Sequence, residues 1–99
     1  MLEKEIQKKV VTYATKKGVK GIRMYFGPGM RVGWPDYLFL IERGNALFIE
    51  FKATGKRPTK KQQQKITILI GLGFSCHVCD NIEYGKKLID LALESRLNR

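Results

Sequence analysis

Two apolar segments separated by a tight turn constrain the fold of this chain more than any other feature. Residues 36–41 and 46–52 are rich in β-branched and aromatic side chains, which favour strands. The Arg43-Gly44-Asn45 sequence between them predicts a hairpin turn. Because strand side chains alternate between faces, Glu50 and Lys52 are expected to share one face of the second strand. The most apolar strand of the chain therefore carries a charged pair.

The register of this hairpin decides whether Asp36 joins that pair. If a three-residue loop pairs Glu42 with Ala46, residue 36 lies opposite residue 52 and residue 38 opposite residue 50. Opposed Cβ atoms lie about 4.5 to 5.5 Å apart and diagonal ones about 7 to 8 Å, a gap that a cation held by two carboxylates can bridge. Mg²⁺ and Mn²⁺ prefer such hard oxygen ligands. The hairpin therefore predicts a metal site at Asp36 and Glu50.

Each charged fragment alone has a simpler interpretation. A Glu-x-Lys sequence on a strand is usually a solvated ion pair of little energetic value, and an Asp after Pro is usually a turn residue. The position of Glu50 and Lys52 within the most apolar strand favours a functional site, because a structural strand would continue its core there.

With these residues identified, the chain resembles the PD-(D/E)xK nucleases, specifically the virus-type replication-repair nuclease (VRR-NUC) domain. The motifs that carry the resemblance span nearly the whole chain and are Gly33-x-Pro35-Asp36, Ile49-Glu50-x-Lys52, Thr59-x-x-Gln62 and Gly73-Phe74. The resemblance implies that Asp36, Glu50 and the Phe51 backbone carbonyl bind metal. It also implies that Lys52 is the catalytic lysine and that Gln62 assists catalysis.

The resemblance further implies a Mg²⁺- or Mn²⁺-dependent endonuclease that hydrolyses DNA phosphodiester bonds. Similar short standalone domains are phage or bacterial DNA-repair enzymes that act as homodimers on branched DNA such as Holliday junctions. Glu5 of the first helix is, by the same resemblance, a candidate metal ligand, although it could instead pair with Lys9 one turn later. Gln62 has an alternative structural role, because Thr59-x-x-Gln62 is a helix capping box, and both roles can coexist.

The charge balance points to nucleic acid as the partner. The 99 residues include 19 Lys and Arg against 9 Asp and Glu, giving a net charge of +10, which favours binding to a polyanion. Trp34, Tyr25 and Phe26 are read either as base-stacking or as core residues, with Phe26 assigned to the core. The lysines of the first helix are read either as a phosphate-facing surface or as a solvated face. The candidate DNA contacts are Arg23, Arg31, Lys56, Arg57, Lys60 and Lys61.

Several features argue against other classes of protein. The longest apolar run, residues 66–74, is shorter than the roughly 20 residues of a membrane span, and the acidic Glu3 and Glu5 do not fit a secretory leader. Cys76 and Cys79 are expected on opposite faces of a strand, so no disulfide is expected between them. Free thiols are typical of a reducing compartment, and a cytoplasmic location is therefore expected. A zinc site at these cysteines and His77 is disfavoured because a fourth ligand is missing.

Hydrophobic periodicity predicts a single α+β (α/β) domain over residues 1–99. The expected elements are a helix at 2–17, strands at 20–26, 36–41 and 46–52, a helix from Thr59 to Gly73, a strand at 74–79 and a final helix. The family resemblance implies the same order in a restriction-endonuclease-like core, with a mixed sheet flanked by helices. Two other functions fit the composition: a non-catalytic basic nucleic-acid-binding module, and a protein-interaction subunit with incidental charge.

Overall fold

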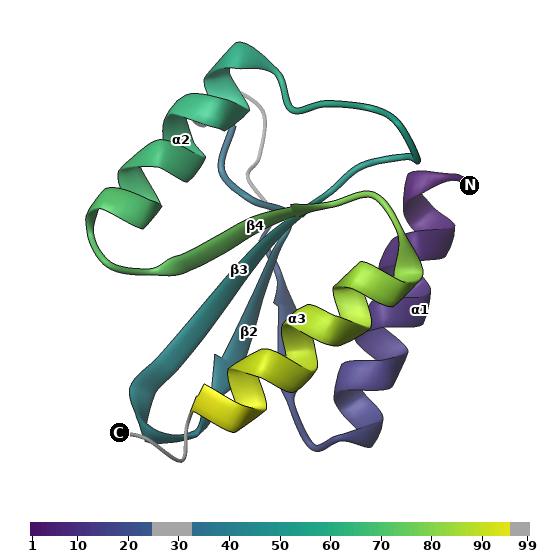
Figure 1. Cartoon of the computed structure of the whole chain (residues 1–99), viewed down its shortest axis with the longest axis vertical. Helices are drawn as coiled ribbons and strands as arrows, with labels where there is room; N and C mark the ends of the chain where they lie inside the picture. The colour runs from purple at the N-terminus through teal and green to yellow at the C-terminus, as the bar shows by residue number, and fades with distance from the viewer. Residues whose placement is uncertain (25–32, 96–99) are drawn as a thin grey trace.

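The computed structural model describes residues 1–24 and 33–95, which form an α+β domain (Figure 1). In chain order the elements are α1 (Glu3–Lys16), β1 (Lys20–Arg23), β2 (Tyr37–Ile41), the 3₁₀ turn η1 (Glu42–Gly44), β3 (Asn45–Phe51), α2 (Lys60–Gly71), β4 (Ser75–Cys79) and α3 (Ile82–Ser95). The predicted order of helix, three strands, helix, strand and helix is confirmed. Tyr25, Phe26 and Arg31 lie outside the described residues.

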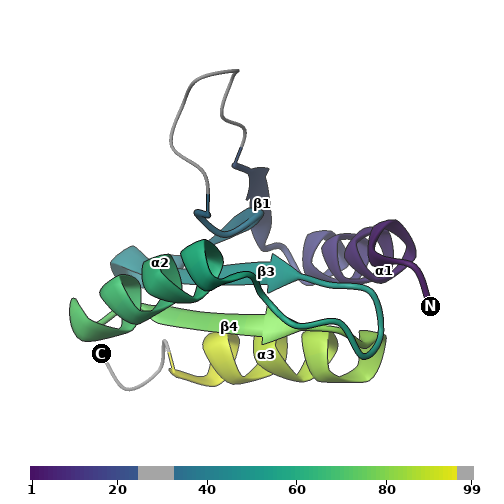
Figure 2. The ribbon, with the colours of Figure 1, turned by 90° about the horizontal axis from the view of Figure 1, so that it is seen from above.

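The strands form one mixed sheet in the order β1-β2-β3-β4. The β1–β2 and β2–β3 pairs are antiparallel, and β3 pairs in parallel with β4. In Figure 2 the arrowheads of β3 and β4 point the same way, toward the side where the N-terminus lies. The hairpin that carries the charged residues therefore lies at the centre of the sheet.

The predicted hairpin register was wrong by one residue at the turn. Ile41 pairs with Asn45, so the three-residue loop is η1 rather than Arg43-Gly44-Asn45. Arg43 adopts a left-handed φ of 64° within this turn and Gly44 a φ of 74°, which lets the chain reverse one residue earlier. Tyr37 consequently pairs with Ile49, and the same register extended by one residue sets Asp36 opposite Glu50. Residue 36 is therefore opposed by residue 50 instead of residue 52. Because side chains alternate between faces, this shift of two positions along β3 keeps Asp36 on the predicted face.

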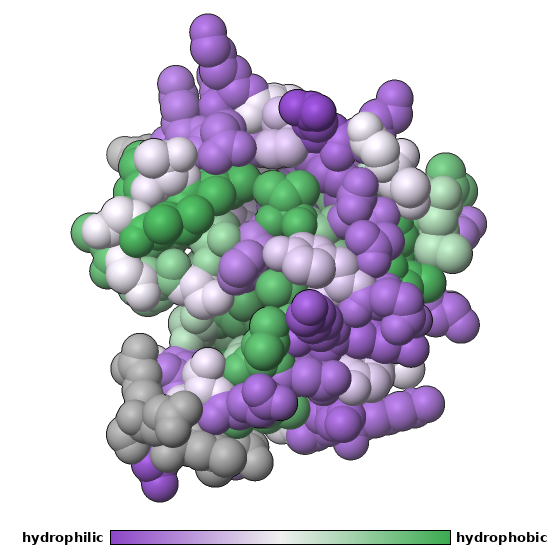
Figure 3. Space-filling view, in the orientation of Figure 1, coloured by the Kyte–Doolittle hydropathy of each residue, from purple (hydrophilic) through white to green (hydrophobic). Residues whose placement is uncertain are grey.

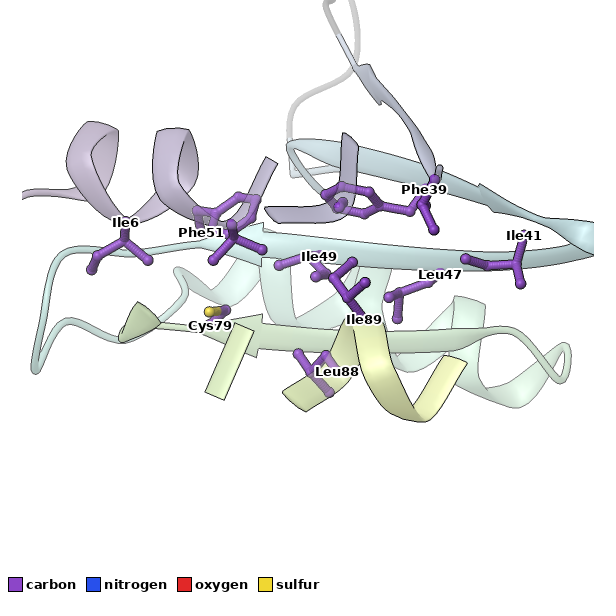
Figure 4. Close-up of a cluster of buried hydrophobic side chains, with 12 residues drawn as sticks. Ile6, Phe39, Ile41, Leu47, Ile49, Phe51, Cys79, Leu88 and Ile89 are labelled. Atoms are coloured by element: carbon purple, nitrogen blue, oxygen red, sulfur yellow. The ribbon is translucent and has the colours of Figure 1, made fainter. Parts of the chain in front are cut away.

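Two hydrophobic clusters lie on opposite faces of the sheet. The larger cluster packs Ile6 and Val10 of α1 and Ile89 of α3 against the inward face of β2 and β3 (Figure 4). The smaller cluster packs Ile66 and Leu69 of α2 against the other face. Figure 1 accordingly shows α2 on one side of the sheet and both other helices on the opposite side. Glu50 is the charged residue buried between these layers.

The alternating pattern of β3 follows the prediction. Leu47, Ile49 and Phe51 belong to the larger cluster, so Glu50 faces α2. Cys76 packs in the smaller cluster and Cys79 in the larger one, so these two free thiols lie on opposite faces of β4 as predicted.

Several element ends differ from the prediction. The first strand is described as far as Arg23, and residues 25 and 26 of the predicted strand lie outside the described residues. Leu2 is 66 % exposed and lies before α1 rather than in its apolar stripe. The last strand begins at Ser75, and Phe74 before it is 44 % exposed. Among the described residues, no helix has the length and apolar character needed to cross a membrane.

Candidate active site

Four segments meet where β3 leaves the core. Glu50 is the penultimate residue of β3 and Lys52 follows its end, while Asp36 directly precedes the adjacent strand β2. Because β2 and β3 run antiparallel, the start of one adjoins the end of the other. The first turns of α1 and α2 complete the surroundings through Glu3 and Gln62. The structure therefore brings Asp36, Glu50, Lys52 and Gln62 together, as the sequence predicted.

Asp36 is fixed by two backbone contacts. Its Oδ2 accepts a hydrogen bond from the Phe51 N–H at 2.9 Å, and its own carbonyl accepts one from the Met24 N–H at 2.7 Å. Pro35 before it is fully buried, which anchors the chain on that side. Burial raises the pKa of the Asp36 carboxyl, against the opposing effects of the Phe51 N–H and Lys52. The Asp36 carboxylate is thus held by the backbone at the end of β3 and also interacts with Glu50.

Glu50 is the most unusual residue of the site. It is 2 % exposed, and its Oε2 accepts from Gln62 Nε2 at 3.1 Å and lies 3.6 Å from Lys52 Nζ. Its Oε1 is buried and has no hydrogen-bond partner among the described residues. Burial, and then the negative charge of Asp36, raise the pKa of Glu50 to about 8, although Lys52 opposes the shift. Without a further cation, both carboxylates cannot be ionised at neutral pH at low cost.

Gln62 forms the predicted capping box and also contacts Glu50. Its Oε1 accepts from the Thr59 N–H at 2.8 Å while its own N–H donates to Thr59 Oγ1 at 3.2 Å, which completes the predicted capping box. The other side of the same amide, Nε2, donates to Glu50. The capping box therefore fixes the orientation of the amide that holds the carboxylate, and it sets the N-terminus of α2 beside the end of β3.

Gly33 makes this approach of α2 possible. It adopts a φ of +100°, and a Cβ at this position would lie 2.9 Å from the Lys61 carbonyl oxygen and 3.2 Å from the Gln62 nitrogen. A side chain at residue 33 would push the first turn of α2 away from the segment that leads to Asp36. In the sequence, Gly33 was noted only as part of the Gly33-x-Pro35-Asp36 motif, so this contact between chain segments was missed.

Glu3, rather than Glu5, is the acidic residue of α1 that faces the cluster. Burial and the charge of Asp36 raise the pKa of Glu3, and Glu3 in turn raises that of Glu50. Glu5 is exposed and lines a groove with Lys8 and Lys9 on another side of α1. The sequence held a signal for this, because Glu3 precedes the buried Ile6 by three residues and so shares its helix face.

The donor set fits a hard divalent cation. Asp36 and Glu50 offer carboxylate oxygens, and the unpartnered Glu50 Oε1 is a buried anionic acceptor that a cation would satisfy. No group of three or more His, Cys, Asp or Glu in the described part of the chain is arranged to hold a metal. The described part of the protein thus offers two carboxylates, a donor set of the hard oxygen type that divalent cations such as Mg²⁺ accept together with water.

Five of the six candidate DNA contacts lie within the described residues, and all five are exposed. Arg23 lowers the pKa of both Asp36 and Glu3 and so lies within their electrostatic reach. The loop after Lys52 and the first turn of α2 carry four further exposed cations, which are Lys56, Arg57, Lys60 and Lys61. Trp34 is half-buried against the smaller hydrophobic cluster, with Lys65 Nζ 4.9 Å above its ring. The described contacts therefore assign Trp34 to packing, while Arg31 lies outside the described residues.

The fold and the Asp–Glu-x-Lys cluster define a domain of the PD-(D/E)xK nuclease class. More specifically, the chain belongs to the VRR-NUC domain family, whose model matches residues 2–81. It is 38 % identical over 80 residues to a protein named "Putative nuclease p44" from Acyrthosiphon pisum secondary endosymbiont phage 1, covering 80 % of this chain and 83 % of that protein. The family and this relative support nuclease function.

Two solved structures share the fold. One, described as "VRR_NUC domain", superimposes with a TM-score of 0.78 at 24 % identity and covers 89 % of this chain and 94 % of the other. A second, described as "VRR_NUC domain protein", gives a TM-score of 0.74 at 18 % identity over 95 % and 89 % of the two chains. Both agree with the mixed sheet and its flanking helices.

Proposed function

We propose that this nuclease domain is a Mg²⁺- or Mn²⁺-dependent DNA endonuclease, selective for branched DNA such as Holliday junctions, that acts as a homodimer. The observation that carries the metal-dependent part is the buried Glu50 carboxylate beside Asp36, with Oε1 unpartnered among the described residues. A buried carboxylate oxygen without a partner is costly, and a bound cation would offset that cost.

Each residue of the cluster has a distinct proposed role. Asp36 and Glu50 would hold the cation, with the Phe51 carbonyl as a further ligand and Glu3, in place of Glu5, as an acidic contributor. When bound, the metal supplies an activated water and stabilises negative charge on the phosphate.

Lys52 would stabilise the substrate phosphate, whereas Gln62 would orient the carboxylate of Glu50. Lys52 Nζ lies 3.6 Å from Glu50 Oε2, so its ammonium can stabilise the charge that develops on a phosphate beside the carboxylates. Gln62 donates to the same oxygen, so Oε1 would remain for a bound cation. This division of the two oxygens gives Glu50 one orientation.

A phosphodiester substrate agrees with the charges near the cluster. The net charge is +10, and the exposed Lys56, Arg57, Lys60 and Lys61 follow directly after the site in the chain. The α2 N-terminus adds a partial positive charge at the same place. Together these features favour a polyanion over a small neutral substrate.

The proposed homodimer uses an apolar surface at the β4 edge of the sheet. Ile68, Ile70 and Leu72 of the α2 region are 46 %, 55 % and 70 % exposed, and no charged residue occurs from residue 66 to residue 79. A groove of about 400 Å³, lined by both apolar and uncharged polar residues, extends this surface past Phe74 to α3. Two copies with a net charge of +10 repel each other least where charge is absent, which favours contact through this face.

The dimer is tested by one charge placed on that surface. We expect Leu72→Lys to convert the dimer to a monomer in sedimentation velocity, whereas Ile22→Lys, which alters the 39 % exposed Ile22 of the opposite edge strand, leaves it intact. A wild-type monomer at all accessible concentrations would contradict the proposed homodimer.

Cleavage of labelled DNA tests the enzyme. A four-way junction, a linear duplex and a single strand are incubated with Mg²⁺, Mn²⁺ or EDTA, and wild type is compared with Lys52→Ala and with the matched control Lys20→Ala on β1. We expect metal-dependent cutting, strongest on the junction, that falls about 100- to 1,000-fold in Lys52→Ala only, the cost of losing one electrostatic stabiliser.

Two results would lead to other conclusions. If neither metal supports cutting while salt-sensitive binding persists, the chain is a non-catalytic nucleic-acid-binding module. Equal cutting of junction and linear duplex would remove the proposed selectivity for branched DNA and leave the nuclease intact.

A further inference from the structure

A second cationic surface lies on the other side of α1 from the carboxylate cluster. It is a groove of about 650 Å³ between α1 and α3. Four lysines line it, Lys8, Lys9 and Lys16 from α1 and Lys86 from α3, against one carboxylate, that of Glu5. In Figure 3 hydrophilic side chains crowd the face over α1 and α3, whereas apolar side chains gather over α2. The groove is thus a concentration of positive charge outside the proposed active site.

The α1 lysines of this groove carry no compensating charge in the described structure. Ion pairs within the described ranges involve Lys17, Lys52 and Lys86, and none involves Lys8, Lys9 or Lys16. The i,i+4 pair between Glu5 and Lys9 that the sequence allowed is not formed. Uncompensated like charges along one helix repel each other, and an anion in the groove would relieve that repulsion.

The ring of Tyr13, which lines the groove, is fixed by hydrogen bonds. The Tyr13 hydroxyl donates to both Asp90 carboxylate oxygens, at 2.8 and 2.9 Å, which fixes its ring between α1 and α3. Lys86 Nζ lies 5.4 Å from the centre of that ring and Lys17 Nζ 5.3 Å from it. Both ammonium groups also pair with carboxylates, Lys17 with Asp90 at 3.9 Å and Lys86 with Glu83 at 4.0 Å, so the uncompensated charges of the groove are those of Lys8, Lys9 and Lys16.

The groove has the dimensions of a short stretch of nucleic-acid backbone. From Glu5 to Lys16 the helix rises by about 16 Å at 1.5 Å per residue. One DNA strand carries a phosphate about every 3.4 Å of helix axis, so about five phosphates match this length. Lysine side chains beside such a backbone contribute sequence-independent affinity.

The groove and the carboxylate cluster cannot receive the same phosphate. Glu3 faces the cluster and Glu5 the groove, and two residues of an α-helix separated by one position point in nearly opposite directions. Met1 also lines the groove, and its carbonyl accepts from the Thr54 N–H in the loop after Lys52. One end of the groove is therefore next to the proposed active site, and the rest leads away from it.

We infer that the α1–α3 groove binds the phosphate backbone of a DNA segment other than the one being cut, such as a second arm of a branched substrate. This rests on the proposed DNA substrate but not on catalysis. It identifies a second DNA-contacting surface, separate from Arg23 and the cations of the loop and helix that follow Lys52.

The test is the salt dependence of binding to a four-way junction with arms of about 15 base pairs, or about 50 Å, longer than the groove. Fluorescence anisotropy in EDTA compares wild type with Lys9→Gln/Lys16→Gln and with Lys20→Gln/Lys87→Gln. The control pair removes the same charge from exposed residues outside the groove. We expect the slope of log K against log salt to fall in magnitude by about two in the groove variant only, about one for each lysine that no longer meets a phosphate.

The outcomes separate this inference from the proposed function. Equal slopes in both double variants, with wild type still cleaving DNA, would overturn the groove assignment alone. A reduced slope in the groove variant of a protein that never cleaves DNA would support the groove and remove the endonuclease. Loss of binding to phosphatidylserine vesicles in the groove variant, with unchanged DNA binding, would assign the groove to a lipid surface and overturn the inference.

Discussion

Replacing Glu50 with Gln is expected to stabilise the metal-free protein at pH 8. The pKa of Glu50 is raised from its usual 4.5 to about 8, first by burial and then by Asp36. The folded state therefore keeps a proton that the unfolded state releases between these values. This contribution to stability is fully present below about pH 4.5 and is lost as the pH rises through 8.

The magnitude follows from the width of that window. Each pH unit within it changes the free energy of unfolding by about 1.4 kcal/mol. Over the roughly three units from pH 5 to pH 8, Glu50 accounts for at most about 4 kcal/mol, a large share of the 5 to 15 kcal/mol typical of a domain. The raised pKa values of Asp36 and Glu3 act in the same direction, whereas His77, whose pKa burial lowers, acts oppositely below about pH 6.5.

The free energy of unfolding is measured with urea in EDTA at about pH 5, 6.5 and 8 for wild type and for Glu50→Gln. The difference between the two proteins isolates the contribution of Glu50, because most other titrating groups contribute equally to both. Wild type should lose stability with rising pH, and Glu50→Gln should lose much less. The control Glu83→Gln, at a side chain that is 89 % exposed, should follow wild type. Saturating Mg²⁺ should restore wild type at pH 8 and have little effect on Glu50→Gln. Parallel pH profiles for wild type and Glu50→Gln would refute the reasoning.

Two further substitutions separate helix formation from site geometry. Gln62→Glu keeps a residue that completes a capping box, so circular dichroism should show unchanged helix content. The new side chain cannot donate to Glu50, and single-turnover cleavage should therefore fall about 10- to 100-fold, the cost of losing one hydrogen bond to a charged group. Gly33→Ala should reduce cleavage as well as stability, because its Cβ would lie 2.9 Å from a backbone oxygen of α2. Gly18→Ala, at a φ of +81° with no atom within 4 Å of the new Cβ, should reduce stability alone, and equal cleavage losses in the two glycine variants would contradict this role for Gly33.

The fold was accessible from the sequence because its elements are marked locally. Apolar spacing predicted the helices, alternation set the faces of β3, and Thr59-x-x-Gln62 marked the start of α2. The exact register of the hairpin could not be predicted from the sequence, because Gly44-Asn45 and Arg43-Gly44 both suggest a reversal of the chain. The outcome depends on whether Arg43 takes a left-handed conformation, with φ 64° in the structure, and such a conformation in a non-glycine residue has no clear sequence signal.

The acidic residue of α1 shows a different limit. Glu3 and Glu5 both lie near the N-terminus, and the family resemblance suggested Glu5. The choice between them depends on which face of α1 packs on the sheet, and Ile6, Val10 and Ala14 decide it. Glu3 extends that buried face by one turn and reaches Asp36 and Glu50 electrostatically. The helical period that places the apolar residues of α1 therefore also distinguishes its two acidic residues.

The geometry of the site depends on backbone contacts that the candidate catalytic side chains alone do not reveal. The Phe51 N–H fixes the Asp36 carboxylate, and the capping box fixes the Gln62 amide against Glu50. Gly33 allows the segment before Asp36 to touch the α2 backbone beside Gln62, so it sets the distance between the two supports of the carboxylate pair. A chain with a larger residue at position 33 could retain every candidate ligand and still hold its carboxylates too far apart to share one cation. For this site, Gly33 is therefore as informative as the charged residues it positions.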